Sequence, residues 1–212
     1  MTLDDVVLVA PNAYPRHREF NLECAHVVSH YADELRDVDG GVILRIWLVA
    51  SPEVQEDEFA ELMRVAELTR TFDFEGYWST SLRKRQELTL TFVEQGCLRV
   101  AARYGWDEAP FAGAGARVRE ADFVFGRFAR RPKASPDRTR KAGIWFEVDE
   151  ARAVVELRVV DRFGEVVDRH PVAETDPVEW WYVPYLGTVH WLDSSTIELR
   201  SKAMHPKTFE VR

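Results

Sequence analysis

The sequence predicts one α+β domain spanning residues 1–212, with a helix-rich N-terminal half around a central strand and an antiparallel β-sheet in the C-terminal half. Three observations lead to this fold class. Apolar residues recur at helical spacing over about 18–37, short runs of strand character alternate with turns beyond Pro110, and no Gly/Ser/Pro-rich linker separates the halves. With 46% hydrophobic residues in 212, the chain can bury one core without metals or disulfides.

The first half is predicted to alternate strands with helices. The expected strands cover 6–10, 42–49 and 71–78, and the expected helices cover about 18–37, 53–70 and 80–104. The run at 42–49 is almost continuously apolar, which is typical of a central strand covered on both faces. Acidic residues occupy the first turns of the second helix, where the helix dipole stabilises negative charge. Gly105 ends the third helix.

Beyond Pro110 the sequence changes to short strands, after a short helix expected over Arg117–Glu120. The expected strands cover 122–130, 143–148, 153–161, 166–170, 179–182, 189–192, 196–201 and 208–211. Hairpin turns are predicted at Asp149-Glu150, Phe163-Gly164-Glu165 and Asp193-Ser194-Ser195. Strands joined by such short turns pair antiparallel, which predicts the sheet of the C-terminal half.

The net charge of −8 is unevenly distributed along the chain. Residues 1–75 contain 16 Asp/Glu against 6 Arg, whereas residues 127–141 contain 7 Lys/Arg against 1 Asp. An acidic surface disfavours nucleic acid and steers a basic partner toward the first half. The basic stretch lacks the interleaved aromatic residues of single-strand binders; it either receives an acidic partner or neutralises the acidic half. We therefore expect no nucleic-acid partner.

Nothing in the sequence indicates export or membrane insertion. The N-terminus opens with acids, and its apolar run at 6–10 is closed by Pro11, which differs from a signal peptide. The longest apolar run, 42–50, is interrupted by Arg45 and is shorter than the roughly 20 residues of a membrane span. We expect a cytoplasmic protein without a membrane partner.

Two histidines on the first predicted helix have the spacing of a metal site. His26 and His30 lie four residues apart, with Glu23 and Glu34 on the same side. The zinc-protease pattern has Glu directly after the first His, and here that residue is Val27. We predict solvated surface histidines, no metal and no cofactor. The alternative is a metal-assisted enzyme that uses His26, His30 and Glu34.

Motifs for nucleophilic catalysis and phosphate binding are missing or incomplete. No Gly-x-Ser-x-Gly is present, and Ser194-Ser195 falls at a predicted hairpin tip. Cys24 and Cys97 are expected to be reduced, buried thiols. The stretch 113–117 begins Gly-x-Gly but lacks a third Gly and a Lys-Ser/Thr ending. We predict no catalytic residue.

A run of three aromatic residues, Trp180-Trp181-Tyr182, stands in a predicted strand. Adjacent side chains of a strand point to opposite faces, so the two tryptophans cannot enter the same core. Either both faces of the sheet are covered, or one large aromatic is exposed as an interface anchor.

Two passages resemble small bacterial immunity-type proteins, which are encoded beside secreted toxins and neutralise them. They are Tyr104-Gly105-Trp106-Asp107 and the stretch from Arg131 to Ala142 that runs into a strand. The likeness extends over about 72–169 and concerns general layout. It implies a cytoplasmic, non-catalytic and acidic protein, and it assigns no functional residue.

The sequence thus favours a cytoplasmic, non-catalytic binding protein that masks a protein partner, such as an immunity protein acting on a basic toxin domain. The predicted contact residues are Asp57, Glu58 and Glu61 on the second helix, or Trp180, Trp181 and Tyr182. Besides the metal-assisted enzyme, one further alternative is open. In it the protein is a structural homo-oligomer whose aromatic strand forms a two-fold interface.

Overall fold

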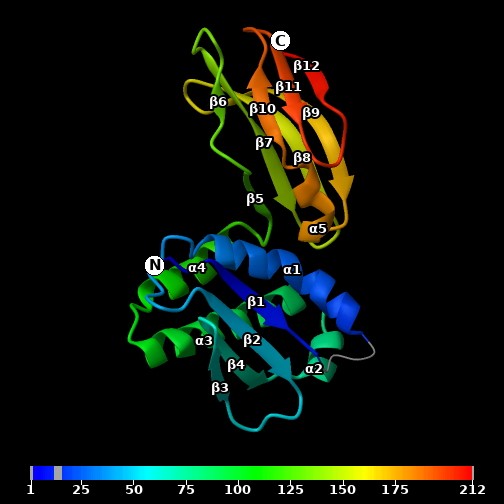
Figure 1. Cartoon of the computed structure of the whole chain (residues 1–212). Coiled ribbons are helices and arrows are strands. Elements are labelled where there is room, and N and C mark those ends of the chain that lie inside the picture. Colours follow the sequence, from blue (N-terminus) through cyan, green and yellow to red (C-terminus); the bar gives the residue numbers. More distant parts are fainter. Residues whose placement is uncertain (1, 12–15, 212) are drawn as a thin grey trace. The chain divides into compact units, whose positions relative to one another are not determined.

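The computed structural model describes residues 2–11 and 16–211. Contacts within the chain divide it into two compact units, 1–125 and 126–212, called unit 1 and unit 2 below (Figure 1). The single domain expected over residues 1–212 stays a prediction. Helices and strands occur together, so the α+β class is confirmed.

Unit 1 is a mixed sheet with helices. Its strands are β1 (Asp5–Val9), β2 (Arg45–Ser51), β3 (Glu58–Leu62) and β4 (Val65–Thr71), and its helices are α1 (His17–Asp33), α2 (Phe74–Trp78), α3 (Leu82–Tyr104) and α4 (Ala109–Glu120). The strand order is β1-β2-β4-β3 (Figure 1). The pairs β1–β2 and β2–β4 are parallel, and β3 lies antiparallel to β4 at the edge. The helix-rich first half is therefore matched only in part, because strands are interspersed with the helices.

The central strand β2 has one covered face, not two. Ile46, Leu48 and Ala50 are fully buried, whereas Trp47 on the opposite face is 38% exposed. Helix α3 lies against the buried face so closely that a Cβ atom on Gly96 would stand 2.7 Å from Leu48. The prediction of two covered faces was wrong because the apolar residues of the outer face are only partly buried.

The helix predicted over 53–70 is instead the hairpin β3–β4. Its two-residue turn, Met63-Arg64, has φ values of +48° and +70°, as a tight hairpin turn requires. The expected helical stripe was misleading because Leu62 and Met63 are exposed. Seven residues of β4 pair with β2, so sheet pairing outweighs the helical pattern.

The strand predicted over 71–78 is also absent after Thr71. Asp73 caps α2 instead, since its Oδ1 accepts a hydrogen bond of 2.8 Å from the backbone N–H of Gly76. The third predicted helix is confirmed as α3, which is capped by Ser81 and ends at Gly105 with φ +70°. The short helix expected over Arg117–Glu120 is the last part of α4.

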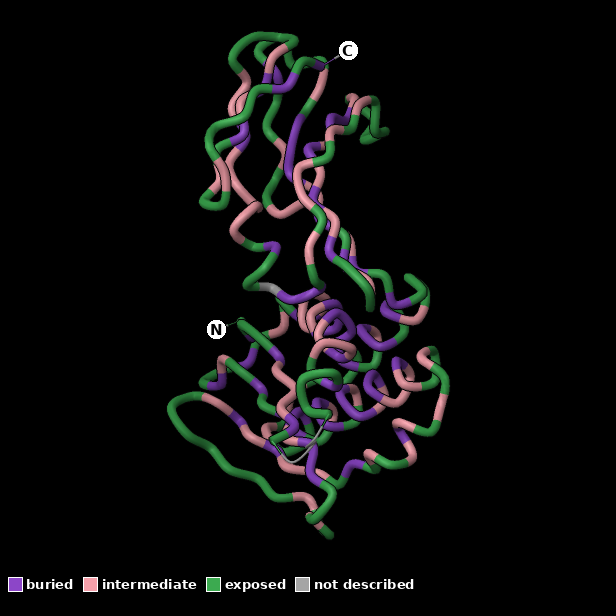
Figure 2. The backbone as a smooth tube through the Cα atoms, turned by 90° about the vertical axis from the view of Figure 1, so that its right-hand side faces the viewer, coloured by how far each residue is buried: buried purple, intermediate pink, exposed green. Residues whose placement is uncertain are grey.

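Unit 2 consists mainly of antiparallel strands. They are β5 (Phe125–Phe128, beginning at the last residue of unit 1), β6 (Lys133–Ala134), β7 (Arg140–Val148), β8 (Ala153–Asp161), β9 (Val166–Thr175), β10 (Thr188–Trp191), β11 (Thr196–Arg200) and β12 (Lys207–Glu210). The successive pairs β7–β8, β8–β9, β10–β11 and β11–β12 are antiparallel, and the three predicted hairpin turns lie between them. Buried and half-buried residues alternate along β8, as expected for a sheet covered mainly on one face. Figure 2 colours the backbone of the chain by burial.

The predicted strand over 179–182 is a short helix, α5 (Glu179–Tyr182), followed by a 3₁₀ turn, η1 (Val183–Tyr185). The backbone N–H of Trp181 donates to the carbonyl of Val178 at 2.9 Å. Pro177 and Pro184 flank the segment, and proline cannot donate to a sheet ladder. The two-fold interface through an aromatic strand therefore has no strand to form it.

Candidate functional site

The aromatic helix α5 presents two large apolar side chains to solvent. Trp180 is 71% exposed and Trp181 is 53% exposed, and Val183 in η1 is also exposed. We call Trp180, Trp181 and Val183 the tryptophan surface. Exposed tryptophans that lie together are typical of a surface that a partner covers.

The opposite side of α5 holds this surface in place. Tyr182 is only 2% exposed, and its ring stacks on Phe146 of β7 with centroids 5.4 Å apart and planes 21° apart. Val178, four residues earlier, is buried too, and this spacing puts both side chains on one helical face. Tyr182 therefore contributes by anchoring α5 to the sheet, while the tryptophans are left outside.

The three acidic residues predicted as partner contacts do not lie on a helix. Asp57 precedes β3 and forms ion pairs with Arg70 and Arg99. Glu61 lies on β3 and accepts a hydrogen bond of 2.7 Å from the Tyr104 hydroxyl. Glu58 begins β3, opposite Thr69. The acidic charge of Asp57 is thus compensated within unit 1, and these acids belong to a different unit from the tryptophan surface.

Both histidines predicted to be solvated are buried. His26 is 1% exposed, with its Nε2 atom 3.4 Å from the amide nitrogen of Gln86. His30 is 6% exposed and stacks on Phe125, and its Nε2 atom lies 3.8 Å from Glu34. The prediction failed because it assumed one buried stripe on α1, whereas both α3 and α4 pack against that helix. Glu34 in turn pairs with Arg117.

The burial of His30 makes stability depend on pH. Burial lowers the pKa of His30, against the opposing effect of Glu34 and Asp33. Below about pH 6.5 His30 is therefore protonated in the unfolded chain, whereas in the folded chain it becomes protonated only at a lower pH. The free energy of unfolding should fall in that window with a slope of up to about 1.4 kcal/mol per pH unit.

We expect His30→Gln to remove this part of the slope. Urea unfolding at a series of pH values between roughly 5 and 8 would measure it. The variant and the wild type are compared by the slope of the free energy of unfolding against pH, so a constant difference in stability between them does not affect the result. Identical slopes in the two proteins would contradict the assignment.

Cys24 and Cys97 are free and buried, as predicted. The Cys24 sulfur lies 3.2 Å from the Thr89 hydroxyl and 3.7 Å from the Tyr77 hydroxyl. Burial raises the pKa of the Cys24 thiol to about 12 and also raises that of Cys97. Because the thiolate is the reactive form, neither sulfur has the character of a nucleophile.

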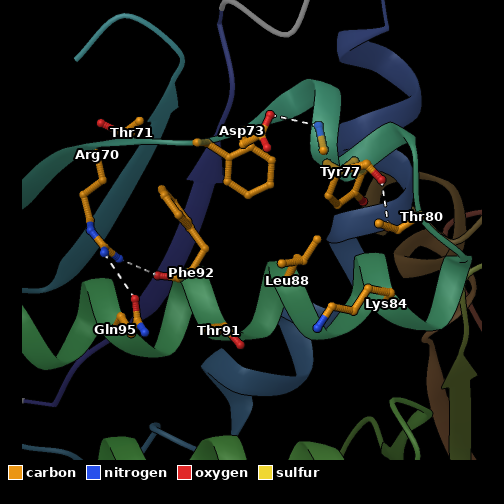
Figure 3. Close-up of a pocket in the computed structure, with 12 residues that line it drawn as sticks. Arg70, Thr71, Asp73, Tyr77, Thr80, Lys84, Leu88, Thr91, Phe92 and Gln95 are labelled. Carbon is orange, nitrogen blue, oxygen red and sulfur yellow. Dashed lines mark hydrogen bonds between the residues drawn. The ribbon is translucent and has the colours of Figure 1, made fainter. Parts of the chain in front are cut away.

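Unit 1 contains a cleft of about 410 Å³ that the sequence did not indicate (Figure 3). It lies between the end of β4, helix α2 and helix α3. The lining residues are Arg70, Thr71, Phe72, Asp73, Gly76, Tyr77, Thr80, Lys84, Leu88, Thr91, Phe92 and Gln95. Those from α3 recur at intervals of three and four residues, the spacing of one helical face. The sequence contains this helical spacing on α3, but it did not reveal the cleft because the opposite wall comes mainly from residues 71–78, which were predicted as a strand.

Comparisons with family models, curated proteins and solved structures found no match to this chain. Within residues 2–11 and 16–211, no three His, Cys, Asp or Glu side chains gather as metal ligands would. In the same described part of the chain, no helix has the length and apolar content needed to cross a membrane. The function is therefore inferred from the surfaces of the chain itself.

Proposed function

We propose that the protein is a non-catalytic binding protein that masks a protein partner, as a cytoplasmic immunity protein masks a toxin. The observation that carries the proposal is the tryptophan surface, where Trp180 and Trp181 stay exposed on a helix fixed by Tyr182. Tryptophan is enriched among the few residues that supply most of the binding free energy in protein interfaces.

The anchoring of α5 supports binding without reorganisation. The stacking of Tyr182 on Phe146 holds the backbone beside the tryptophans in the unbound chain. A surface that is ordered before binding avoids part of the entropy cost of association. The indole N–H groups of the two tryptophans are available to donate hydrogen bonds to a partner.

The charge distribution indicates the chemistry of that partner. Unit 1 carries 22 Asp/Glu against 13 Lys/Arg, a net charge of −9, whereas unit 2 carries 14 against 15, a net charge of +1. The net negative charge of the protein thus comes from unit 1. A basic partner would be attracted by this charge over about a Debye length, which raises its association rate.

The product of the neighbouring gene is the partner to test first, because immunity proteins are encoded beside their toxins. We expect the purified chain to bind that product, and Trp180→Ala and Trp181→Ala each to weaken the affinity about 30-fold, which corresponds to roughly 2 kcal/mol. Biolayer interferometry measures both affinities, and a growth assay with the co-expressed product measures protection.

Phe163→Ala is the matched control. Phe163 is also a highly exposed aromatic of unit 2, on the β8–β9 turn, and its removal should leave the affinity unchanged. Equal losses in all three variants, or no binding of the neighbouring product, would argue against the proposal. Sedimentation at several concentrations tests the homo-oligomer alternative. If the chain self-associates and Trp181→Ala weakens that association, the tryptophan surface binds a second copy of the chain and not a different protein.

A further inference from the structure

The cleft of unit 1 lies where open sheets with parallel strands bind ligands. Arg70 and Thr71 end β4, the strand paired in parallel with β2, and Phe72 and Asp73 follow directly. In doubly wound α/β sheets, ligands bind in crevices outside the carboxyl ends of the strands, and the cleft of unit 1 lies at the same end of its parallel strands. Its volume of about 410 Å³ falls in the range of about 300–1,000 Å³ that holds small molecules.

The floor of the cleft is an aromatic cluster that is already packed. Phe72 contacts the rings of Phe20, Phe74, Tyr77 and Phe92, with centroids between 4.8 and 5.5 Å apart. Only the edge of this cluster reaches the cleft, since Phe72 and Phe92 are mostly buried. A flat apolar molecule can therefore lie on a rigid surface without forcing the side chains to rearrange.

Two of the charged residues at the rim are engaged in bonds within the chain. The Arg70 guanidinium donates to the Phe92 carbonyl at 3.1 Å and to the Gln95 side chain at 3.3 Å (Figure 3). It also lies 3.5 Å from Asp57. The Asp73 carboxylate accepts the Gly76 N–H that caps α2. Both groups therefore hold the walls of the cleft in position.

Lys84 is the charged residue at the rim that is left for a ligand. It is exposed on the first turn of α3 and, in the part of the chain that the structure describes, forms no ion pair or side-chain hydrogen bond (Figure 3). The lining carries two cations, Arg70 and Lys84, against one acid, Asp73, in a unit whose net charge is −9. Arg70 is already paired with Asp57, which leaves Lys84 as the lining cation that can pair with an anionic group of a ligand.

We propose that this cleft binds a small molecule with a flat apolar body and one anionic group. The body lies against Phe72, Leu88 and Phe92, and the anionic group pairs with Lys84. The Thr91 hydroxyl, seven residues along the same helical face, is a further hydrogen-bond donor for the ligand. This site is independent of the tryptophan surface and of the proposed partner.

The test uses two fluorescent probes with similar aromatic bodies. 8-Anilinonaphthalene-1-sulfonate carries the anionic group, and N-phenyl-1-naphthylamine lacks it. We expect the sulfonate to bind the full-length chain with saturation at one site, and Lys84→Met to weaken it about tenfold while leaving the neutral probe unchanged. Lys202→Met removes an exposed lysine of unit 2 and should change neither titration.

Two blocking variants locate the site. Leu88→Trp and Thr91→Trp each fill the cleft from α3, so both probes should lose binding; circular dichroism checks that each variant is folded. Unchanged titrations in a folded blocking variant would place the probes elsewhere and overturn the proposal. The proposal would also be overturned if Lys84→Met left the affinity for the sulfonate unchanged. Lys84 is exposed, so this substitution is not expected to disturb the core.

Discussion

Replacing Tyr182 by alanine is expected to lower the free energy of unfolding of unit 2 by about 3–4 kcal/mol, the usual cost of deleting a buried aromatic side chain. The side chain is 2% exposed and stacks on Phe146, so its removal leaves a cavity between α5 and β7. Because unit 1 does not contain these residues, its stability should stay unchanged. Hydrogen exchange read by mass spectrometry would show faster exchange than in the wild type for peptides of β7 and β8, and an unchanged rate for peptides of α3.

Trp181→Ala is the matched control for this prediction. Trp181 is the preceding residue and is 53% exposed, so its loss should change the stability by no more than about 0.5 kcal/mol. The pair of variants separates anchoring from binding, because Trp181→Ala should weaken partner binding while unit 2 stays intact. If Tyr182→Ala is as stable as the wild type, Tyr182 does not hold α5 on the sheet.

Gly96→Val is expected to destabilise unit 1 by about 3 kcal/mol. A Cβ atom at this position would stand 2.7 and 3.0 Å from the two Leu48 methyl groups, and Leu48 is fully buried under α3. The added volume must push the helix away from β2, and overpacking of this kind costs about 1–3 kcal/mol, occasionally more. Urea unfolding with exchange in peptides of β2 and α3 would measure the loss.

Gly113→Ala provides a control of opposite sign. Gly113 lies in α4, where the nearest atom to a new Cβ is a nitrogen of the flexible Arg117 side chain at 3.1 Å. Alanine should therefore stabilise this helix by up to about 1 kcal/mol through its better helix propensity. A stabilised Gly96→Val protein would mean that α3 and β2 do not approach each other as closely as described.

Gly96→Val is also expected to alter the cleft. Helix α3 carries Lys84, Leu88 and Thr91 on its cleft side and lies on the sheet through Gly96. A helix displaced at Gly96 would move the wall that these residues form. The variant should thus weaken the neutral aromatic probe as well as the anionic one, unlike Lys84→Met.

The sequence by itself determined the elements whose signals are local. Helix α3 has its apolar residues and the left-handed Gly105 at its end within one segment. The hairpins of unit 2 are specified by polar turns between two strands that are close in sequence, and β8 was predicted with its observed bounds. These turn and helix-end signals act between residues that are neighbours along the chain, so they do not require contacts with distant segments.

Only the tertiary structure decided the rest, because the deciding contacts are between residues distant in sequence. Residues 65–71 form a strand because β2 offers a parallel partner, and His26 and His30 are buried because α1 is covered by two other helices. Whether Tyr182 or its neighbouring tryptophans would be buried depended on where Phe146 lies. The cleft joins the end of β4 with a face of α3. Burial and proximity are properties of the folded chain, and the periodicity of one segment does not contain them.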